Sequence, residues 1–273
     1  VSLVEFPLPS HEPALEETRN RIRSFIAAEM ASLTPRKRAR SWTGFDAEFS
    51  RKLGAAGFIG MTWPRGFGGQ QQGSLQRYVV LEELLAAGAP VAAHWIADRQ
   101  SGPLLLKFGT SKQRAELLPR IAAGECYFCI GMSEPGSGSD LAAVRTRARP
   151  VEGGYRVSGT KLWTTYAHES HYMILFCRTG AAEDRHGGMS QFLVPMNARG
   201  LSVSPIVDLA GEHHFNEVVL DDVFLGTDAL IGKEGEGWDQ VTSELALERS
   251  GPERFLSSIT VLIELIRRLS ARP

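Results

Sequence analysis

The sequence of 273 residues is low in cysteine, close to neutral and without long apolar runs. Three cysteines are too few, and odd in number, for a disulfide framework. A formal net charge of −1 argues against a dedicated nucleic-acid-binding protein, which would carry a strongly basic face. The apolar stretches fall far short of the ~20 residues that cross a bilayer, and no signal-peptide pattern opens the chain. We therefore expect a soluble, intracellular and cytoplasmic protein that binds no nucleic acid and has no membrane span.

Cys126 and Cys129 have the spacing of a metal-binding or redox pair. No second pair and no histidine cluster accompanies them, and two buried thiols on an apolar strand explain the spacing as well. His213 and His214 are adjacent, so in a strand they would point to opposite faces. We therefore expect no metal site.

Three blocks of secondary structure follow one another along the chain. Apolar residues at steps of three and four predict helices over 16–33, 45–53, 75–85 and 112–123. Short runs rich in β-formers then predict strands around 155–157 and over 172–177, 191–196, 201–206 and 217–225. Helical spacing returns from Trp238 to Ile266. Blocks of this kind predict an α+β multidomain fold, with a middle β-barrel or sandwich, rather than a Rossmann fold.

Two short segments carry the chemistry. Residues 131–140 read Gly-Met-Ser-Glu-Pro-Gly-Ser-Gly-Ser-Asp, and such a run lets backbone N–H groups approach an anion. It lacks the ending of a P-loop, and by composition alone a plain surface turn fits as well. Residues 159–165 read Gly-Thr-Lys-Leu-Trp-Thr-Thr and place Trp163 in a predicted strand beside threonine hydroxyls. That indole would face a flat ring or pack in the core, and both interpretations are open.

Together these segments resemble the acyl-CoA dehydrogenase family. Residues 131–140 match its Gly-x-Ser/Thr-Glu-Pro-x-x-Gly-Ser-Asp signature at every position, and residues 159–165 match its Gly-x-Lys-x-Trp-x-Thr pattern. Further matches lie in order along nearly the whole chain, at 63–69, 108–119, 215–223 and 232–238. The resemblance implies an N-terminal helical domain over 1–125, a middle β domain over 126–231 and the start of a C-terminal helical bundle over 232–273. Family subunits extend further at their C-terminal end.

The resemblance also implies a ligand set. It implies FAD as the cofactor, an acyl-CoA as the substrate, an electron-transfer flavoprotein as the electron acceptor, and a homo- or hetero-oligomer. FAD would lie between the middle and last domains. The residues expected to bind it are Ile130, Met132, Ser133, Gly138, Ser139, Trp163, Thr164 and Thr165. Ser133 would serve the pyrimidine side of the isoalloxazine, Trp163 would cover the ring, and Thr165 would bond near N5. Ser139 would meet the FAD pyrophosphate or the pantetheine arm of CoA.

Desaturation beside a thioester requires a carboxylate base in a dry site. Glu248 interrupts the apolar stripe of the last helix, between Leu245 and Phe255, where an unpaired acid is unusual. Family members carry the base either here or in a more C-terminal region, and a structural pairing of Glu248 with an arginine is also open. Arg249 matches a substrate-binding position, although a solvated charge on the helix face explains it equally. We interpret Glu134 as a structural acceptor of backbone hydrogen bonds.

The resemblance therefore predicts α,β-dehydrogenation of an acyl-CoA, with base-catalysed removal of the α-proton and hydride transfer to flavin N5. Two alternatives stay open. One is an acyl-CoA oxidase or flavin monooxygenase on the same fold, and the other is a non-catalytic subunit of a mixed oligomer. The sequence predicts neither the length nor the class of the acyl group.

Overall fold

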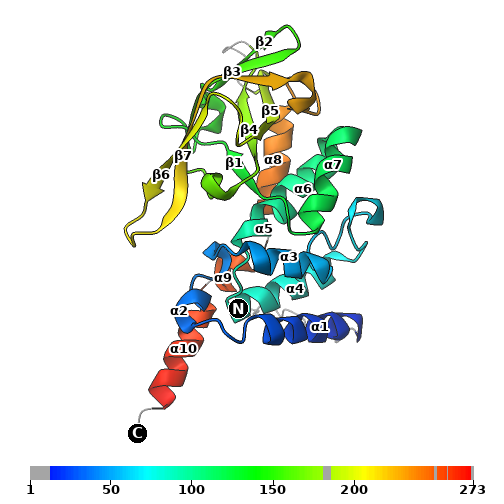
Figure 1. Ribbon diagram of the computed structural model, residues 1–273, viewed down its shortest axis with the longest axis vertical. Coiled ribbons are helices and arrows are strands. Elements are labelled where there is room, and N and C mark those ends of the chain that lie inside the picture. The colour runs from blue at the N-terminus through cyan, green and yellow to red at the C-terminus, as the bar shows by residue number, and fades with distance from the viewer. Residues whose placement is uncertain (1–12, 181–185, 249–250, 257, 272–273) are drawn as a thin grey trace, which may run out of the picture.

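The computed structural model describes residues 13–180, 186–248, 251–256 and 258–271. A helical region, a β-sheet and a second helical region follow one another along the chain (Figure 1). This order confirms the predicted α+β fold, and its middle block is an eight-stranded sheet. Within the described ranges, every helix is too short or too polar to cross a bilayer.

Seven helices are described before the sheet. They are α1 (Pro13–Glu29), α2 (Pro35–Arg38), α3 (Ala47–Ala55), α4 (Ser74–Ala87), α5 (Ala92–Ile96), α6 (Gly102–Phe108) and α7 (Ser111–Ala122). Local signals set their ends: Thr110 and Gln113 form a capping box on α7, and Gly88 ends α4 with a left-handed φ of 73°. The sequence predicted α1, α3, α4 and α7. It missed α2, α5, α6 and the π-helical turn η3 (Ala97–Ser101) between α5 and α6.

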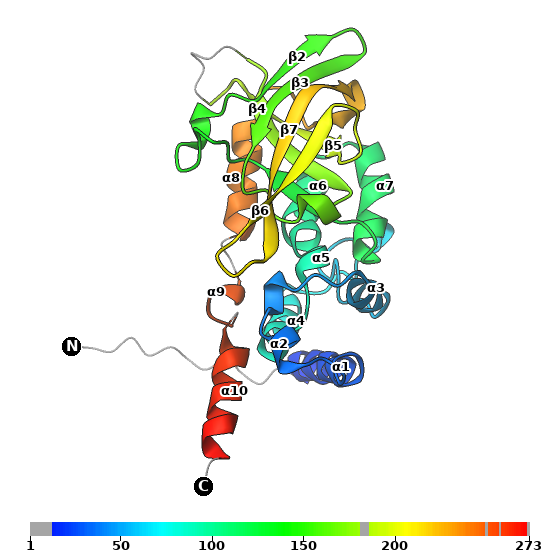
Figure 2. The same cartoon turned by 60° about the vertical axis from the view of Figure 1, so that its left-hand side comes forward.

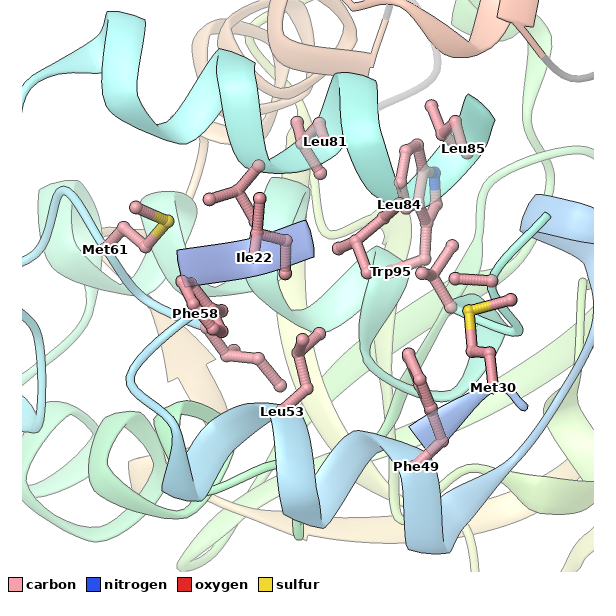
Figure 3. Close-up of a cluster of buried hydrophobic side chains, with 14 of the residues drawn as sticks. Ile22, Met30, Phe49, Leu53, Phe58, Met61, Leu81, Leu84, Leu85 and Trp95 are labelled. Carbon is pink, nitrogen blue, oxygen red and sulfur yellow. The ribbon is translucent and has the colours of Figure 1, made fainter. Parts of the chain in front are cut away.

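The helical region has its own apolar core, in which α1, α3, α4 and α5 meet (Figure 3). Ile22 and Leu53 are fully buried there against Leu84 and Leu85 of α4. Trp95 of α5 packs into the same core. The core therefore fixes α5, and with it the turn η3 that follows.

The sheet contains β1 (Phe128–Gly131), β2 (Arg147–Val151), β3 (Gly154–Lys161), β4 (Tyr172–Arg178), β5 (Met189–Pro195), β6 (Leu201–Val207), β7 (His213–Gly226) and β8 (Leu230–Ile231). Its order is β6-β7-β3-β2-β4-β5-β8, and β1 pairs with β4 in parallel. The sequence predicted β3 to β7 within a few residues. It was wrong about Trp163, because β3 ends at Lys161 and Trp163 lies in the turn that follows.

The cysteines confirm the interpretation as buried thiols. Cys126, Cys129 and Cys177 are free and buried beside or within the sheet. Burial raises the pKa of Cys126 to about 11 and the pKa of Cys129 and of Cys177 to about 12. Thiols with such values stay protonated and inert near neutrality.

The apolar stripe predicted from Trp238 to Ile266 is divided among three helices. These are α8 (Gly237–Glu248), α9 (Glu253–Leu256) and α10 (Ile259–Ser270). α8 lies against the sheet and α6, whereas α10 projects away from the molecule (Figures 1 and 2). The stripe does not face inward throughout, because Phe255 is 61% exposed and Ile266 is 53% exposed. The buried face of α8 instead carries Gln240, Val241 and Glu244.

Candidate active site

A cleft of about 570 Å³, called here the central cleft, lies where the helical region, the sheet and the end of α8 meet. The helical region contributes Trp42, Thr43, Ala92, Trp95, Ile96 and Gln100 to its lining. The sheet region contributes Ile130, Met132, Ser133, Trp163, Thr165, Tyr166, His214 and Phe215. Glu248 and Glu253 complete it from the last segment. Six of the residues that the sequence predicted for the site therefore line a single cleft.

A buried ion pair holds the turn that follows β1. The Glu134 carboxylate accepts hydrogen bonds from the backbone nitrogens of Arg145 at 2.7 Å and Thr146 at 2.9 Å, and from Lys161 Nζ at 2.8 Å. Burial opposes ionisation of Glu134, but Lys161 and these hydrogen bonds outweigh it and lower its pKa. Glu134 is thus a structural acceptor, as the sequence suggested, and its partner Lys161 is fully buried.

The end of β3 also fixes the cleft side of this turn. Lys161 Nζ donates to the carbonyl oxygen of Met132 at 3.0 Å, and the amide of Leu162 donates to that of Ser133 at 2.9 Å. The end of one strand thereby holds two consecutive carbonyls. The side chains of Met132 and Ser133 line the cleft.

The segment after β3 is bound to β7 by alternate residues. Thr164 N donates to Asn216 O at 2.9 Å, and Tyr166 N donates to His214 O at 2.8 Å. Trp163 and Thr165, which alternate with these two, line the cleft. Thr164 is 1% exposed and is absent from the lining, and its Oγ1 has no hydrogen-bond partner among the described residues.

Trp163 has an unusual backbone and an unusual exposure for a tryptophan. Its φ is 60°, in the left-handed region, which costs a non-glycine residue about 1–2 kcal/mol. Its side chain is 56% exposed and packs edge-on against Phe215, with ring centroids 5.9 Å apart. A strained residue that presents a bare indole to a cleft is typical of a binding site for a flat ring.

Two family models match this chain. Residues 12–125 match the family model "Acyl-CoA dehydrogenase, N-terminal domain", and residues 129–223 match "Acyl-CoA dehydrogenase, middle domain". The chain belongs to the acyl-CoA dehydrogenase family. It is 33% identical over 269 residues to acyl-CoA dehydrogenase IpdE1 of Mycobacterium tuberculosis, covering 94% of this chain and 70% of that protein.

Two solved acyl-CoA dehydrogenase structures extend the comparison. The ChsE4-ChsE5 complex of Mycobacterium tuberculosis contains a chain that is 34% identical, with a TM-score of 0.78, over 88% of this chain and 61% of that one. A glutaryl-CoA dehydrogenase of Mycobacterium smegmatis in complex with FADH2 is 25% identical, with a TM-score of 0.69, over 85% and 59%. The chain thus spans about 59% to 70% of the length of these three relatives, which belong to a flavin-dependent oxidoreductase family.

Besides the buried Thr164, three predicted site residues lie outside the central cleft or outside the described residues. Gly138 and Ser139 are exposed in the turn after β1 and do not line the cleft, so their proposed contacts with the FAD pyrophosphate or with CoA stay predictions. Arg249 lies outside the described residues. These positions carry no geometric support here.

One acid that sequence reasoning missed is Glu244, and Glu253 in the cleft lining is another. Glu244 is 1% exposed, one helical turn before Glu248, and its Oε2 accepts a hydrogen bond from Gln191 Nε2 at 3.0 Å. Burial raises its pKa to about 7, a rise that the hydrogen bond from Gln191 opposes and Glu248 reinforces. The i, i+4 spacing of the two acids was the available signal. The sequence pattern assigned Leu245, and not Glu244, to the buried stripe, and so the prediction followed a neighbouring face of the helix.

A larger hollow of about 1020 Å³ lies between α7 and the loops around β6 and β7. Its charged side chains are paired on the surface, as in Lys112 with Asp228 at 2.8 Å and Arg156 with Asp222 at 3.4 Å. None of the site residues predicted from the sequence lines this hollow, whereas six of them line the central cleft. We therefore place the candidate active site in the central cleft.

Proposed function

We propose that the enzyme to which this chain contributes oxidises an acyl-CoA thioester between its α- and β-carbons, with FAD in the central cleft and Glu248 as the base. One observation carries the proposal. Ser133, Trp163 and Glu248 come from three separate segments of the chain, and all three line the same cleft. Each has the chemistry that one part of such a reaction needs.

The residues of the cleft fit a flavin ring. The exposed indole of Trp163 offers a flat apolar face, and the hydroxyls of Ser133 and Thr165 offer hydrogen bonds at its edge. The held turn of Met132 and Ser133 keeps these groups preorganised. When bound, FAD supplies the acceptor for the β-hydrogen, which leaves as a hydride.

Glu248 is placed to take the α-proton. It is the last residue of α8, its side chain lines the cleft, and it is half-buried. As its carboxylate accepts the proton, the electron pair of the α C–H bond forms the new α–β double bond while the β-hydrogen leaves with its own pair. Trp42, Trp95 and Ile96 add apolar surface to the same cleft.

The partners follow from the same proposal. Reduced FAD needs an electron acceptor, for which we propose an electron-transfer flavoprotein. We also propose that the subunits form a homo- or hetero-oligomer, and the similarity to a chain of the ChsE4-ChsE5 complex supports the second form. The cytoplasmic location stays a prediction.

Anaerobic titration of the complete FAD-bound enzyme with acyl-CoAs, from short-chain to steroid-sized, tests the function. We expect the flavin absorbance to bleach with at least one of them, and bleaching with none would contradict the proposal. Glu248→Gln should abolish bleaching and leave FAD bound, whereas Glu169→Gln, an exposed acid outside the cleft, should bleach normally. Slow reoxidation of the bleached enzyme by oxygen would support a dehydrogenase, and rapid turnover with peroxide would support the oxidase alternative.

A further inference from the structure

The buried side chain of Arg99 caps the C-terminus of helix α8, whose last residue is Glu248. The last carbonyls of a helix have no partner within it. Arg99 Nε donates to the carbonyl oxygen of Leu247 at 3.0 Å, and Arg99 Nη2 donates to that of Glu248 at 2.6 Å. A cation at a helix C-terminus is also favoured by the helix dipole. Arg99 therefore fixes the backbone of the proposed base.

The same guanidinium pairs with the second acid of the central cleft. Arg99 Nη1 lies 2.6 Å from Glu253 Oε1, and the two side chains are 3% and 7% exposed. The guanidinium also lies over the ring of Trp95, 5.1 Å from its centroid. A single side chain of η3 thus connects the end of α8 to the start of α9.

Gly251 shows how closely this arrangement is packed. A Cβ built on Gly251 would lie 2.9 Å from Arg99 Nη2 and 2.4 Å from Glu253 Oε2. The first of these distances is too short for an ordinary contact, and the second is shorter still. A side chain at this position would therefore require the ends of Arg99 or Glu253 to shift.

We propose that Arg99 is the positioning residue of Glu248, and that Glu253 neutralises Arg99 so that no uncompensated cation lies beside the base. This inference rests on the proposed function of Glu248. The bond to the backbone of Glu248 fixes where α8 ends and so directs the Glu248 side chain into the cleft. Pairing with Glu253 cancels a charge that would otherwise favour ionised Glu248 and make it a weaker base.

Other ionisable groups lie on the elements around the end of α8 or in the lining of the central cleft. They are Glu244 of α8, Lys107 of α6, His94 of α5, Asp98 of η3 with its partner Arg77 of α4, and Tyr166 and His214 from the sheet region. Asp98 and Arg77 neutralise each other at 2.9 Å, and Lys107 reaches Ser243 on the exposed side of α8. Of the described cations, Arg99 is the one that hydrogen-bonds to the backbone of Glu248.

The test compares Glu253→Gln, Arg99→Lys and Arg99→Met in the complete FAD-bound enzyme, with Lys107→Met as the matched control. The pH dependence of the anaerobic flavin-reduction rate is measured with a substrate that bleaches the wild type. In Glu253→Gln we expect the acid limb of the profile to move down by about one pH unit, because Arg99 is no longer neutralised. Arg99→Met should slow reduction more than about tenfold with little change in KM, as expected for a misplaced base.

Arg99→Lys keeps the charge but loses the two-pronged contact. It should retain the wild-type pH profile and recover part of the rate lost in Arg99→Met. A second measurement does not depend on the chemistry. Hydrogen exchange at the amides of α9 should accelerate in Arg99→Met and stay unchanged in Lys107→Met.

An acid limb that does not move in Glu253→Gln would overturn the proposal, even where Arg99→Met fails to fold. So would an Arg99→Met enzyme with the wild-type rate, or a Lys107→Met enzyme with the same pH shift as Glu253→Gln. Failure of the proposed function has a different signature. A Glu248→Gln enzyme that still bleaches would move the base elsewhere, whatever the Arg99 variants do.

Discussion

The amide nitrogen of Leu162 donates a hydrogen bond to the carbonyl oxygen of Ser133 at 2.9 Å. This bond joins the two segments on which the family resemblance rests, residues 131–140 and 159–165. The Lys161–Glu134 ion pair lies beside it and joins the same segments through side chains. The turn and the strand end therefore form one unit, whose cleft side carries Ser133 and Trp163.

Trp163→Ala should weaken FAD binding with little effect on folding. The side chain is 56% exposed, so its removal should change the free energy of unfolding by only about 0.5 kcal/mol. Loss of a ring-on-ring contact should weaken FAD binding by about tenfold, and Trp163→Phe should keep most of the affinity. The measurement is the release of FAD on dilution, followed by flavin fluorescence. Phe224→Ala removes an aromatic side chain of similar exposure outside the cleft, and equal loss of FAD in that variant would contradict the assignment.

Lys161→Met should be strongly destabilising. It leaves the buried Glu134 carboxylate without its cation, which costs about 3–5 kcal/mol of unfolding free energy for a buried pair. Adding Glu134→Gln should recover part of that loss, because the uncompensated charge is then gone. Urea denaturation of Lys161→Met and of the double variant Lys161→Met/Glu134→Gln measures both effects. Lys52→Met, which breaks an exposed pair with Glu29, should have a much smaller effect on stability, and a similarly small effect at Lys161 would refute the argument.

The sequence predicted much of the fold because most elements carry local signals. Thr110 and Gln113 cap α7, Gly88 ends α4, and alternating residues set the middle strands. It missed α5, η3 and α6, whose residues are buried on several sides and show no single apolar face. It also missed Arg99 and Glu253, since the partners of Arg99 lie about 150 residues further along the chain and no local pattern marks such a pair. Residues of the cleft that belong to a motif were predicted, and residues brought there by tertiary packing were not.

Glu244→Gln should change how stability depends on pH. The folded pKa of Glu244 is raised to about 7 from its ordinary value of 4.5. Between these values the folded chain keeps a proton that the unfolded chain has lost, so the free energy of unfolding falls as pH rises through this window. The loss should reach about 3 kcal/mol above pH 7, and Glu244→Gln should remove it. Urea denaturation at pH 5 and pH 8 measures the difference. Glu169→Gln serves as the exposed control, and an identical pH dependence in Glu244→Gln and wild type would contradict the prediction.

His94→Gln should reveal a pH dependence of the opposite sign. His94 is 4% exposed and shares a hydrogen bond of 2.8 Å with Ser50 Oγ, and burial lowers its pKa to about 4, although Asp98 opposes the shift. Between about pH 6.5 and pH 4 the unfolded chain binds a proton that the folded chain excludes, so the free energy of unfolding falls as pH drops, by up to about 3 kcal/mol. From pH 4.5 to 6.5 this slope offsets that of Glu244. His94→Gln should therefore show the Glu244 slope alone in that range, with stability falling as pH rises. Urea denaturation at pH 5 and pH 6.5 measures how the free energy of unfolding changes with pH. The same change in His94→Gln and in wild type would contradict this expectation.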